Sequence, residues 1–282
     1  MITEIILGGI ISISTEGSKT ILVTGGSGVI GKIICKKLLL SGYIVENWDL
    51  NTKKHKNFYV NNYKIVRLDF NNKNLLQKKL LNIKKKQNKY FAVIFAHGIH
   101  EIGDLWNYKQ STIDKFMQVN FQANALIISH LSKQIESRII NLSSISTLIP
   151  IPYSGIYSAS KAALNSWLTS VNFELNLIGV KTSNLIVGNI NTGFNEKGRR
   201  LSLFRKNTIS NEYIISLSNR INSRLGIDPE VIANKILKIL ESRHPKNTYL
   251  YGKNVKLFNL IEKFLGSNFA IILAHKYITR KQ

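Results

Sequence analysis

The chain has 282 residues, of which 44% are hydrophobic, so it can bury a substantial core within one α/β domain. Its single cysteine, Cys35, excludes an internal disulfide framework and favours a reducing, cytoplasmic location. The net charge of +23 is spread over many segments without a basic stripe that alternates with aromatic residues, so we expect no specific nucleic-acid partner. The six histidines show no paired spacing on one helix, and we expect no metal site.

Residues 1–18 form an N-terminal extension that contains an apolar run. The run carries Glu4, lacks a basic leader and is too short for a membrane helix, so we expect neither secretion nor a membrane span. An added strand and an arm without fixed structure both remain open for this segment.

From residue 19 onwards, short apolar runs alternate with segments of helical spacing. We expect strands near residues 20–24, 43–49, 63–69, 90–96, 137–143, 180–187 and 247–251. We expect helices near residues 28–41, 72–88, 111–133, 154–178, 228–242 and 255–266. This alternation implies an α/β fold with a Rossmann-like, doubly wound parallel sheet, formed by a single domain over residues 19–252.

The first strand leads into a glycine-rich turn, TGGSGVIG, and then into an amphipathic helix. Glycines at positions 25, 26, 28 and 31 allow positive φ and a close approach of the backbone to a ligand. The helix start offers free N–H groups and a positive dipole to a pyrophosphate. The turn therefore predicts a nucleotide site, and a purely structural turn is the alternative.

Asp49 ends the second predicted strand, about twenty residues after the glycine turn. A carboxylate in this place accepts hydrogen bonds from the adenosine ribose and repels a 2′-phosphate, so we expect NAD(H) to be preferred over NADP(H). Two alternatives stay open: Asp49 is only a strand-end cap, or Lys53 and Lys54, close behind it, receive a 2′-phosphate.

Tyr157 and Lys161 are four residues apart in a predicted helix, so their side chains share one face. A nearby fixed positive charge favours phenolate by roughly one to three pKa units, which would bring tyrosine from about 10 towards a useful acid/base range. Ser144, at the end of the apolar run IINLSS, can donate to the substrate oxygen on which that proton moves. An exposed Tyr/Lys pair on a helix surface is the alternative.

These motifs together resemble the short-chain dehydrogenase/reductase family over residues 20–252. The family pattern also has an Asp ending the third strand at the adenine, matched by Asp69 in YKIVRLDF. Its active-site Asn, in the helix after the fourth strand, is matched by Asn120 in FMQVNFQANA. Its loop over the nicotinamide resembles VGNINT, residues 187–192.

The resemblance implies an NAD(P)-dependent oxidoreductase that moves a hydride between nicotinamide and a carbonyl or secondary alcohol. It implies that Tyr157 is the catalytic acid/base and that Lys161 holds the ribose and lowers the tyrosine pKa. It also implies that Ser144 steadies the carbonyl and that Asn120 supports a water-linked proton path. The residues implied to bind the cofactor are Gly25, Ser27, Gly28, Val29, Ile30, Gly31, Asp49, Asp69, Phe70, Ala96, Gly98, Tyr157, Lys161, Ile190 and Thr192.

The alternative is a catalytically silent NAD(P)-binding regulator or scaffold of the same fold, against which the retention of all four catalytic residues argues. The sequence departs from the family at three places. The glycine spacing TGxxGxxG is similar to that of the longer sugar-nucleotide branch, and Val187 stands where the family has proline. The usual NNAG appears as FAHG, which loses two amides expected to brace the sheet. We expect His97 and His100 to be loop residues near the cleft mouth, with substrate contact as the alternative.

Residues 253–282 are predicted to form a C-terminal helical extension with apolar residues at helical spacing and a basic finish. We expect this helix to pack on the domain, with a sister subunit or a membrane surface as alternatives. The resemblance also implies a homo-oligomer that joins through the helices carrying Asn120 and Tyr157.

Overall fold

The computed structural model describes residues 19–52, 61–102, 108–192 and 226–266, together with residues 268–269, 271–273 and 276. The predicted N-terminal extension, the lysines at positions 53 and 54, and the segment 193–225 lie outside the described residues.

The described residues form a seven-stranded sheet in the order β3-β2-β1-β4-β5-β6-β7, and every strand pair is parallel. The chain order changes direction between β1 and β4, and in such sheets ligands bind outside the carboxyl ends of the strands at this point. The strands are β1 (Thr20–Thr24), β2 (Ile44–Asp49), β3 (Tyr63–Arg67), β4 (Tyr90–Phe95), β5 (Ile135–Ser144), β6 (Lys181–Val187) and β7 (Thr248–Tyr251).

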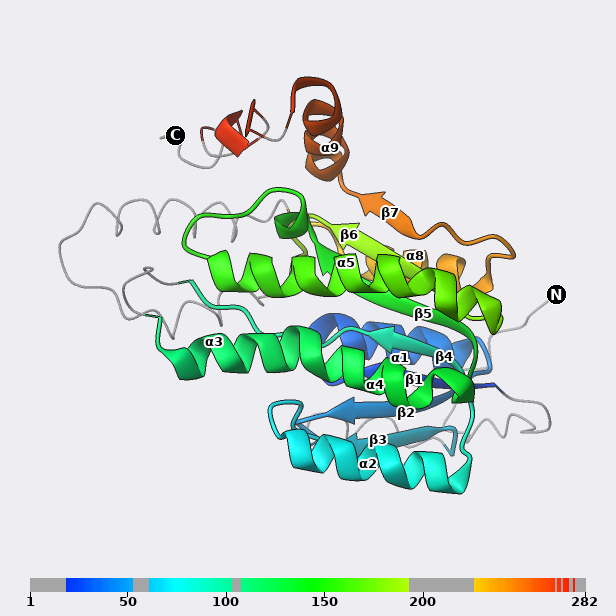
Figure 1. Ribbon diagram of the computed structural model, residues 1–282. Helices are drawn as coiled ribbons and strands as arrows, with labels where there is room; N and C mark the ends of the chain where they lie inside the picture. The colour runs from blue at the N-terminus through cyan, green and yellow to red at the C-terminus, as the bar shows by residue number, and fades with distance from the viewer. Residues whose placement is uncertain are drawn as a thin grey trace.

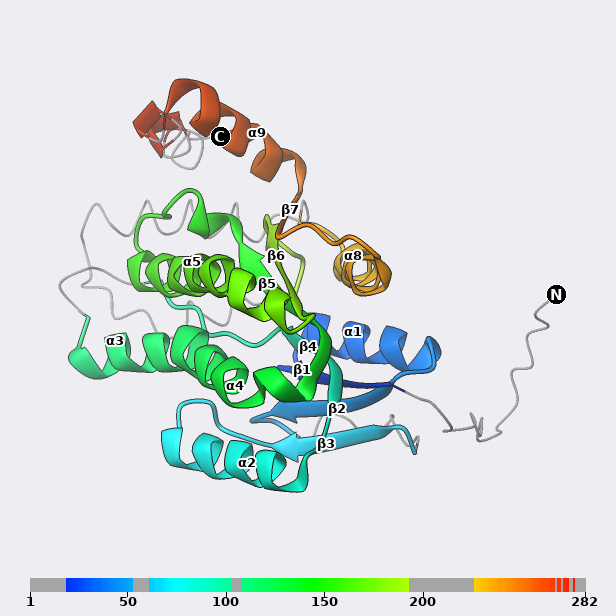
Figure 2. The same ribbon diagram turned by 45° about the vertical axis from the view of Figure 1, so that its right-hand side comes forward.

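Helices cover both faces of the sheet, as Figures 1 and 2 show. On one face lie α1 (Val29–Leu40) and α8 (Pro229–Glu241). The other face is covered by α2 (Lys73–Lys86), α3 (Gln110–Met117), α4 (Ala123–Leu131) and α5 (Gly155–Leu177). Successive strand residues contribute to opposite faces, with Leu22 in one core cluster and Ile21 and Val23 in the other. The predicted doubly wound parallel sheet is confirmed.

The helix predicted over residues 111–133 is interrupted by a π turn, η3 (Gln118–Gln122), between α3 and α4. The Asn124 side-chain amide donates to the carbonyl of Asn120 at 3.0 Å, so a backbone group in this wider turn keeps a partner. Two short 3-10 turns, η4 (Ser132–Gln134) and η5 (Ile145–Thr147), flank β5. Single π turns inside α-helices are frequent at functional sites.

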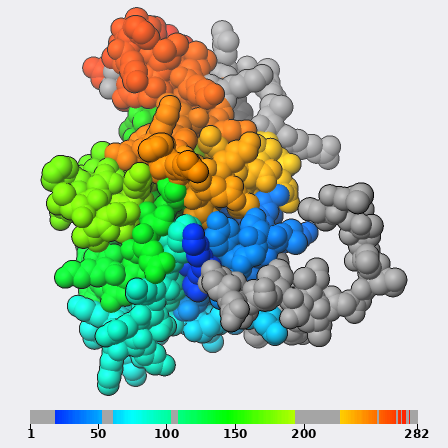
Figure 3. Space-filling view, turned by 90° about the vertical axis from the view of Figure 1, so that its right-hand side faces the viewer, coloured from blue at the N-terminus to red at the C-terminus, as the bar shows by residue number. Residues whose placement is uncertain are grey.

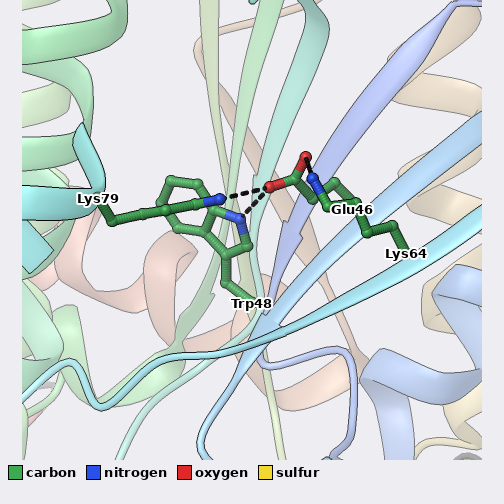
Figure 4. Close-up of polar contacts among 4 residues, drawn as sticks. All are labelled: Glu46, Trp48, Lys64 and Lys79. Carbon is green, nitrogen blue, oxygen red and sulfur yellow. Dashed lines mark hydrogen bonds and ion pairs between the residues drawn. The ribbon is translucent and has the colours of Figure 1, made fainter. Parts of the chain in front are cut away.

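Strand β2 carries a buried carboxylate, Glu46, which Figure 4 shows among three donors. Its Oε1 accepts from Trp48 Nε1 at 2.7 Å and from Lys79 Nζ at 3.1 Å, and its Oε2 accepts from Lys64 Nζ at 3.3 Å. Burial alone would raise the pKa of Glu46, but the Trp48 hydrogen bond and the two lysine charges outweigh it and lower the pKa. The carboxylate is therefore held ionised between β2, β3 and α2.

Helix α9 (Lys253–Leu265) packs on the domain along one side and leaves the other side exposed. Val255 and Phe258 are buried, whereas Leu257 and Leu260 are each 53% exposed and Phe264 is 78% exposed. Figures 1 and 2 show the helix standing away from the sheet beyond β7. Among the described residues, no helix is both long enough and apolar enough to cross a membrane.

Candidate active site

A cleft of about 700 Å³ opens at the carboxyl ends of the central strands. It brings together residues from both halves of the sheet, and a pocket of this size fits a cofactor or other small molecule. Of the predicted site residues it is lined by Gly25, Ser27, Gly28, Val29, Ile30, Asp49, Asp69, Phe70, Ala96, Gly98, Ser144, Tyr157, Lys161, Ile190 and Thr192. Gly31 and Asn120 were also predicted for the site, but neither lines this cleft.

Three glycines of the turn, Gly25, Gly26 and Gly31, are needed for packing against the protein itself. Gly25 has φ +75°, and a Cβ there would lie 2.6 Å from the His97 backbone. A Cβ on Gly31 would lie 2.1 Å from the carbonyl oxygen of Gly25, which explains the glycine without a ligand. The structure therefore gives Gly31 a packing position behind the cleft.

Two side chains of β2 hold the turn in place. The Gly26 amide donates to Asn47 Oδ1 at 2.8 Å, and the Ser27 amide donates to Asp49 Oδ2 at 2.9 Å. Asn47 was missed by the sequence analysis, although a polar residue in the apolar run YIVENWD was a signal for a buried role. Asn47 also donates from its side-chain nitrogen to the Tyr63 hydroxyl at 2.9 Å, so both the oxygen and the nitrogen of its amide have partners.

These contacts leave the start of α1 as the candidate anion site of the turn. The Gly25 amide donates to the Trp48 carbonyl and the Gly28 amide to the Gly25 carbonyl, so the amides of residues 25 to 28 have partners within the protein. The N-cap residue, Gly28, supplies no side-chain hydrogen bond to the first turn of the helix. The N–H groups of the first turn of α1 lie next to Val29 and Ile30, which line the cleft. They can therefore donate hydrogen bonds to a pyrophosphate.

Tyr157 and Lys161 lie on α5 and both line the cleft. Part of the Tyr157 ring faces the cleft, but burial raises the pKa of its hydroxyl to about 12, and a hydrogen bond with Ser144 lowers it only in part. The expectation that Lys161 brings this pKa towards neutrality is not met, because desolvation is the dominant effect. The phenol is therefore protonated at neutral pH.

Lys161 is 6% exposed and extends towards β5. Its Nζ donates to the Leu142 carbonyl at 3.3 Å, and a Cβ on Gly98 would lie 3.4 Å from the same nitrogen. Burial lowers the pKa of Lys161 to about 8. The residue is a buried ammonium whose charge is lost just above neutral pH.

Asn120 is fully buried in the π turn behind the cleft wall. Its Oδ1 accepts from the Ile99 amide at 2.9 Å, while its Nδ2 donates to the Ile99 carbonyl and to Ser160 Oγ, each at 3.0 Å. Asn120 thus joins the loop after β4 to the helix that carries Tyr157. This geometry makes it a positioning residue.

His97 and His100 are buried, which corrects the expectation that they lie at the mouth of the cleft. His97 Nδ1 lies 2.7 Å from Thr24 Oγ1, and its Nε2 lies 2.9 Å from the Val119 carbonyl. Because a carbonyl only accepts, Nε2 carries the proton and Nδ1 accepts from the threonine. Burial, aided by the charge of Lys161, lowers the pKa of His97 to about 3. The His97 ring therefore connects β1 to η3. This is the bracing role that we expected of the two amide side chains in the family's NNAG, which this sequence lacks.

His100 lies beside the tyrosine. Its Nε2 is 3.1 Å from Ser154 Oγ, and its ring meets the Tyr157 ring edge-on with centroids 4.6 Å apart. Burial lowers the pKa of His100 to about 4, so the ring is neutral. His100 packs against the tyrosine ring without adding charge.

Two further contacts shape the cleft wall around predicted residues. Phe70 stacks on His97 with ring centroids 4.0 Å apart, which fixes the wall beside Asp69. An isolated bridge between Ile190 and Ile227 supports the segment after β6. Val187, Gly188 and Asn189 belong to the loop predicted over the nicotinamide. The lining residues that the sequence analysis did not assign to the cofactor or to catalysis are Leu50, Asn51, Asn71, His97, Ile99, His100, Lys115, Val119, Leu142, Ser143, Ile145, Ile151 and Ser154.

Comparison with known proteins assigns the class. Residues 19–201 match the family model described as short chain dehydrogenase, and the chain belongs to this family. The protein is therefore an NAD(P)-dependent oxidoreductase with a small-molecule substrate.

Three known proteins show how far the similarity extends. The chain is 26% identical over 255 residues to the 3-ketodihydrosphingosine reductase of Bacteroides thetaiotaomicron, covering 88% of this chain and 93% of the relative. It is 24% identical to the NADPH-dependent 3-dehydrocapnine reductase of Ornithobacterium rhinotracheale, covering 84% and 89% respectively. A short chain dehydrogenase of Burkholderia cenocepacia in complex with NADP has a similar fold, with a TM-score of 0.71 at 16% identity over 94% of this chain and 98% of that one.

Proposed function

We propose that the protein reduces a ketone, or oxidises the corresponding secondary alcohol, with Tyr157 as the group that gives or takes the proton. The observation that carries this proposal is the Tyr157 hydroxyl, hydrogen-bonded to Ser144 on the wall of the cleft and protonated at neutral pH. A protonated phenol at this place can donate its proton as a bound carbonyl is reduced.

Bound reduced nicotinamide supplies the hydride that the carbonyl carbon receives. The Ser144 hydroxyl donates a hydrogen bond to the carbonyl oxygen and fixes its position. As negative charge grows on that oxygen, Tyr157 transfers its proton to it, so the product is a neutral alcohol. In the oxidising direction the same phenol oxygen takes the proton back.

Lys161 and Asn120 support this proton transfer in different ways. The ammonium of Lys161, in the same cleft wall, would stabilise the phenolate left after transfer and would hold the cofactor by donating to a ribose hydroxyl. Asn120 is hydrogen-bonded to the Ile99 backbone and to Ser160, so it fixes the loop after β4 relative to α5, the helix that carries Tyr157. We assign it the support of a water-linked proton path through this loop.

We propose NAD(H) as the preferred cofactor, because Asp49 lines the cleft with its carboxylate fixed by the Ser27 amide. A carboxylate there binds ribose hydroxyls and repels a 2′-phosphate. One relative is named as NADPH-dependent, so the preference needs its own measurement. Titration with NADH and NADPH by fluorescence should give the tighter binding to NADH, and tighter NADPH binding would refute this assignment.

The ketone assignment draws on the names of two relatives, one for a 3-keto and one for a 3-dehydro substrate. A panel of ketones, sugar nucleotides and acyl thioesters assayed with both reduced cofactors tests it. We expect ketone-dependent oxidation of NADH, with Ser144→Ala much slower on the same substrate. Turnover confined to sugar nucleotides or acyl thioesters would contradict the ketone assignment.

We also propose that residues 19–252 are the catalytic domain of a cytoplasmic homo-oligomer. Phe173 and Leu177 of α5 are 73% and 74% exposed, which supports a subunit contact on this helix. Sedimentation at moderate salt is expected to show a species larger than the monomer. A monomer alone would remove this proposal.

A further inference from the structure

Helix α9 has apolar residues on two opposite sides. Val255 and Phe258 face the domain, where Phe258 packs in a small cluster with Ile149. Leu257, Leu260 and Phe264 are 53%, 53% and 78% exposed. With 3.6 residues per turn, these three fall on the side of the helix opposite the buried pair. The domain that holds one side therefore cannot also cover the other.

The exposed apolar surface continues beyond α9. The described residues that follow it include Phe269, Ile272 and Leu273, which are 49%, 54% and 37% exposed. In the space-filling view of Figure 3, the orange-red C-terminal residues project past those of β7 and α8. Exposed apolar side chains gathered on a projecting element mark an interaction site.

The charges around this surface are basic. From residue 253 to residue 282 the sequence has six lysine or arginine residues and a single acidic one, Glu262. Lys256 and Lys263 are exposed on one flank of the outer apolar side of α9. Lysine stems lie along apolar surface while their ammonium groups reach polar surroundings. An apolar stripe edged by lysines complements anionic lipid headgroups, whereas a second copy of the same basic surface would be repelled.

We propose that the outer side of α9, defined by Leu257, Leu260 and Phe264, docks on an anionic membrane surface. The apolar side chains enter the boundary between headgroups and acyl chains, and Lys256 and Lys263 bind the headgroups. The helix lies on the membrane without spanning it.

Docking in this way brings the cleft to the membrane. The Gly188 amide, at the cleft wall, donates to the Tyr251 carbonyl at 3.2 Å, immediately before α9 begins. Phe258 packs in the same cluster as Ile145, another cleft-lining residue. The base of α9 therefore packs against residues of the cleft wall, Gly188 through Tyr251 and Ile145 through Phe258. This arrangement assigns an amphiphilic ketone carried in the membrane as the substrate, and the assignment rests on the proposed ketone reduction. The ketone enters the cleft directly from the lipid surface.

Vesicle flotation of the full-length chain tests the docking. The probes are vesicles of phosphatidylcholine alone and of phosphatidylcholine mixed with phosphatidylglycerol. We expect the wild type to float with the anionic vesicles, and L260S/F264S and K256E/K263E each to bind them at least about tenfold more weakly. The matched control is L75S/L81S, which replaces two exposed leucines of α2 and should bind as the wild type does. NADH titration shows that each variant is folded.

Equal flotation of the wild type and both α9 variants would overturn the proposal. It would also be overturned if sedimentation without vesicles showed a dimer that L260S/F264S converts to monomer, with flotation unchanged, because a second copy would then cover the helix.

The substrate assignment has a separate readout. Turnover of a long-chain ketone held in anionic vesicles should fall at least about tenfold in L260S/F264S, and turnover of a short water-soluble ketone should not change. Equal loss on both ketones would overturn delivery from the membrane. Failure of the wild type on every ketone would count against the proposed reduction alone, because flotation does not depend on catalysis.

Discussion

Glu46 and Lys161 are both buried and both ionisable, but the protein treats them in opposite ways. Glu46 has three donors, two of them cations, and its pKa is lowered so that it stays charged (Figure 4). Lys161 donates to a neutral carbonyl, and burial lowers its pKa to about 8 so that it is close to losing its charge. A buried charge that is neutralised by its partners has a structural role, and we call Glu46 with its three donors the framework. A buried charge without a charged partner on a cleft wall is poised to change its protonation state, so it is a candidate for a catalytic role.

Of the two buried charges, the poised one, Lys161, should give the larger effect when it is removed. We expect Lys161→Met to lower ketone turnover by at least about 10²-fold, because the phenolate formed at Tyr157 loses its nearby cation. Its free energy of unfolding without nucleotide should be unchanged or higher at pH 7, since a desolvated ammonium is removed. Steady-state kinetics and urea unfolding of the same preparations give both values.

Lys79→Met is the matched control for the framework. It removes one cation from Glu46, so we expect lower stability with turnover kept near the wild-type value. If Lys79→Met lost turnover and Lys161→Met lost stability, the contrast between the two regions would be wrong.

Removing the framework carboxylate should affect folding alone. We expect Glu46→Ala to lower the free energy of unfolding by about 1–3 kcal/mol at pH 7, because Trp48 Nε1 and Lys79 lose their acceptor. The folded pKa of Glu46 is lowered, so its stabilisation is present above the unfolded value of about 4.3 and is lost as the pH falls through the folded pKa. The difference between variant and wild type should therefore shrink in acid.

Glu136→Gln serves as the control for this measurement. Glu136 is half-exposed and lies 3.9 Å from Lys89, so its removal should cost no more than about 0.5 kcal/mol. A loss at Glu136 as large as that at Glu46 would show that the burial of Glu46 is not what makes its ion pairs stabilising.

The smallest predicted effect is the pH dependence contributed by Lys161. Its folded pKa of about 8 lies below the unfolded value of about 10.4, so the unfolded chain binds more protons between these two values. Stability without nucleotide should thus rise with pH across this window, and the rise should be smaller in Lys161→Met. Parallel stability curves for the two proteins would mean that Lys161 is not desolvated as described.

The sequence predicted the strands and helices closely because apolar runs and helical spacing are local signals. It did not predict Asn47 or the bracing role of His97, since their partners at Gly26 and Val119 meet them only through the folding of distant segments. The direction of the Tyr157 pKa shift was also wrong, because residue spacing reports a nearby charge but not the depth of burial. For α9 the apolar pattern was evident, but which side the domain would leave exposed was not.

The proposed reaction depends most directly on the proton held by Tyr157. Single-turnover oxidation of NADH by a ketone that the wild type reduces should be compared in the wild type, Tyr157→Phe and Tyr43→Phe, the last a tyrosine outside the cleft lining. We predict that Tyr157→Phe slows the reaction by about 10²–10⁴-fold while NADH affinity is retained, and that Tyr43→Phe reacts at the wild-type rate. Near-normal turnover by Tyr157→Phe would contradict the assignment of Tyr157 as the proton donor.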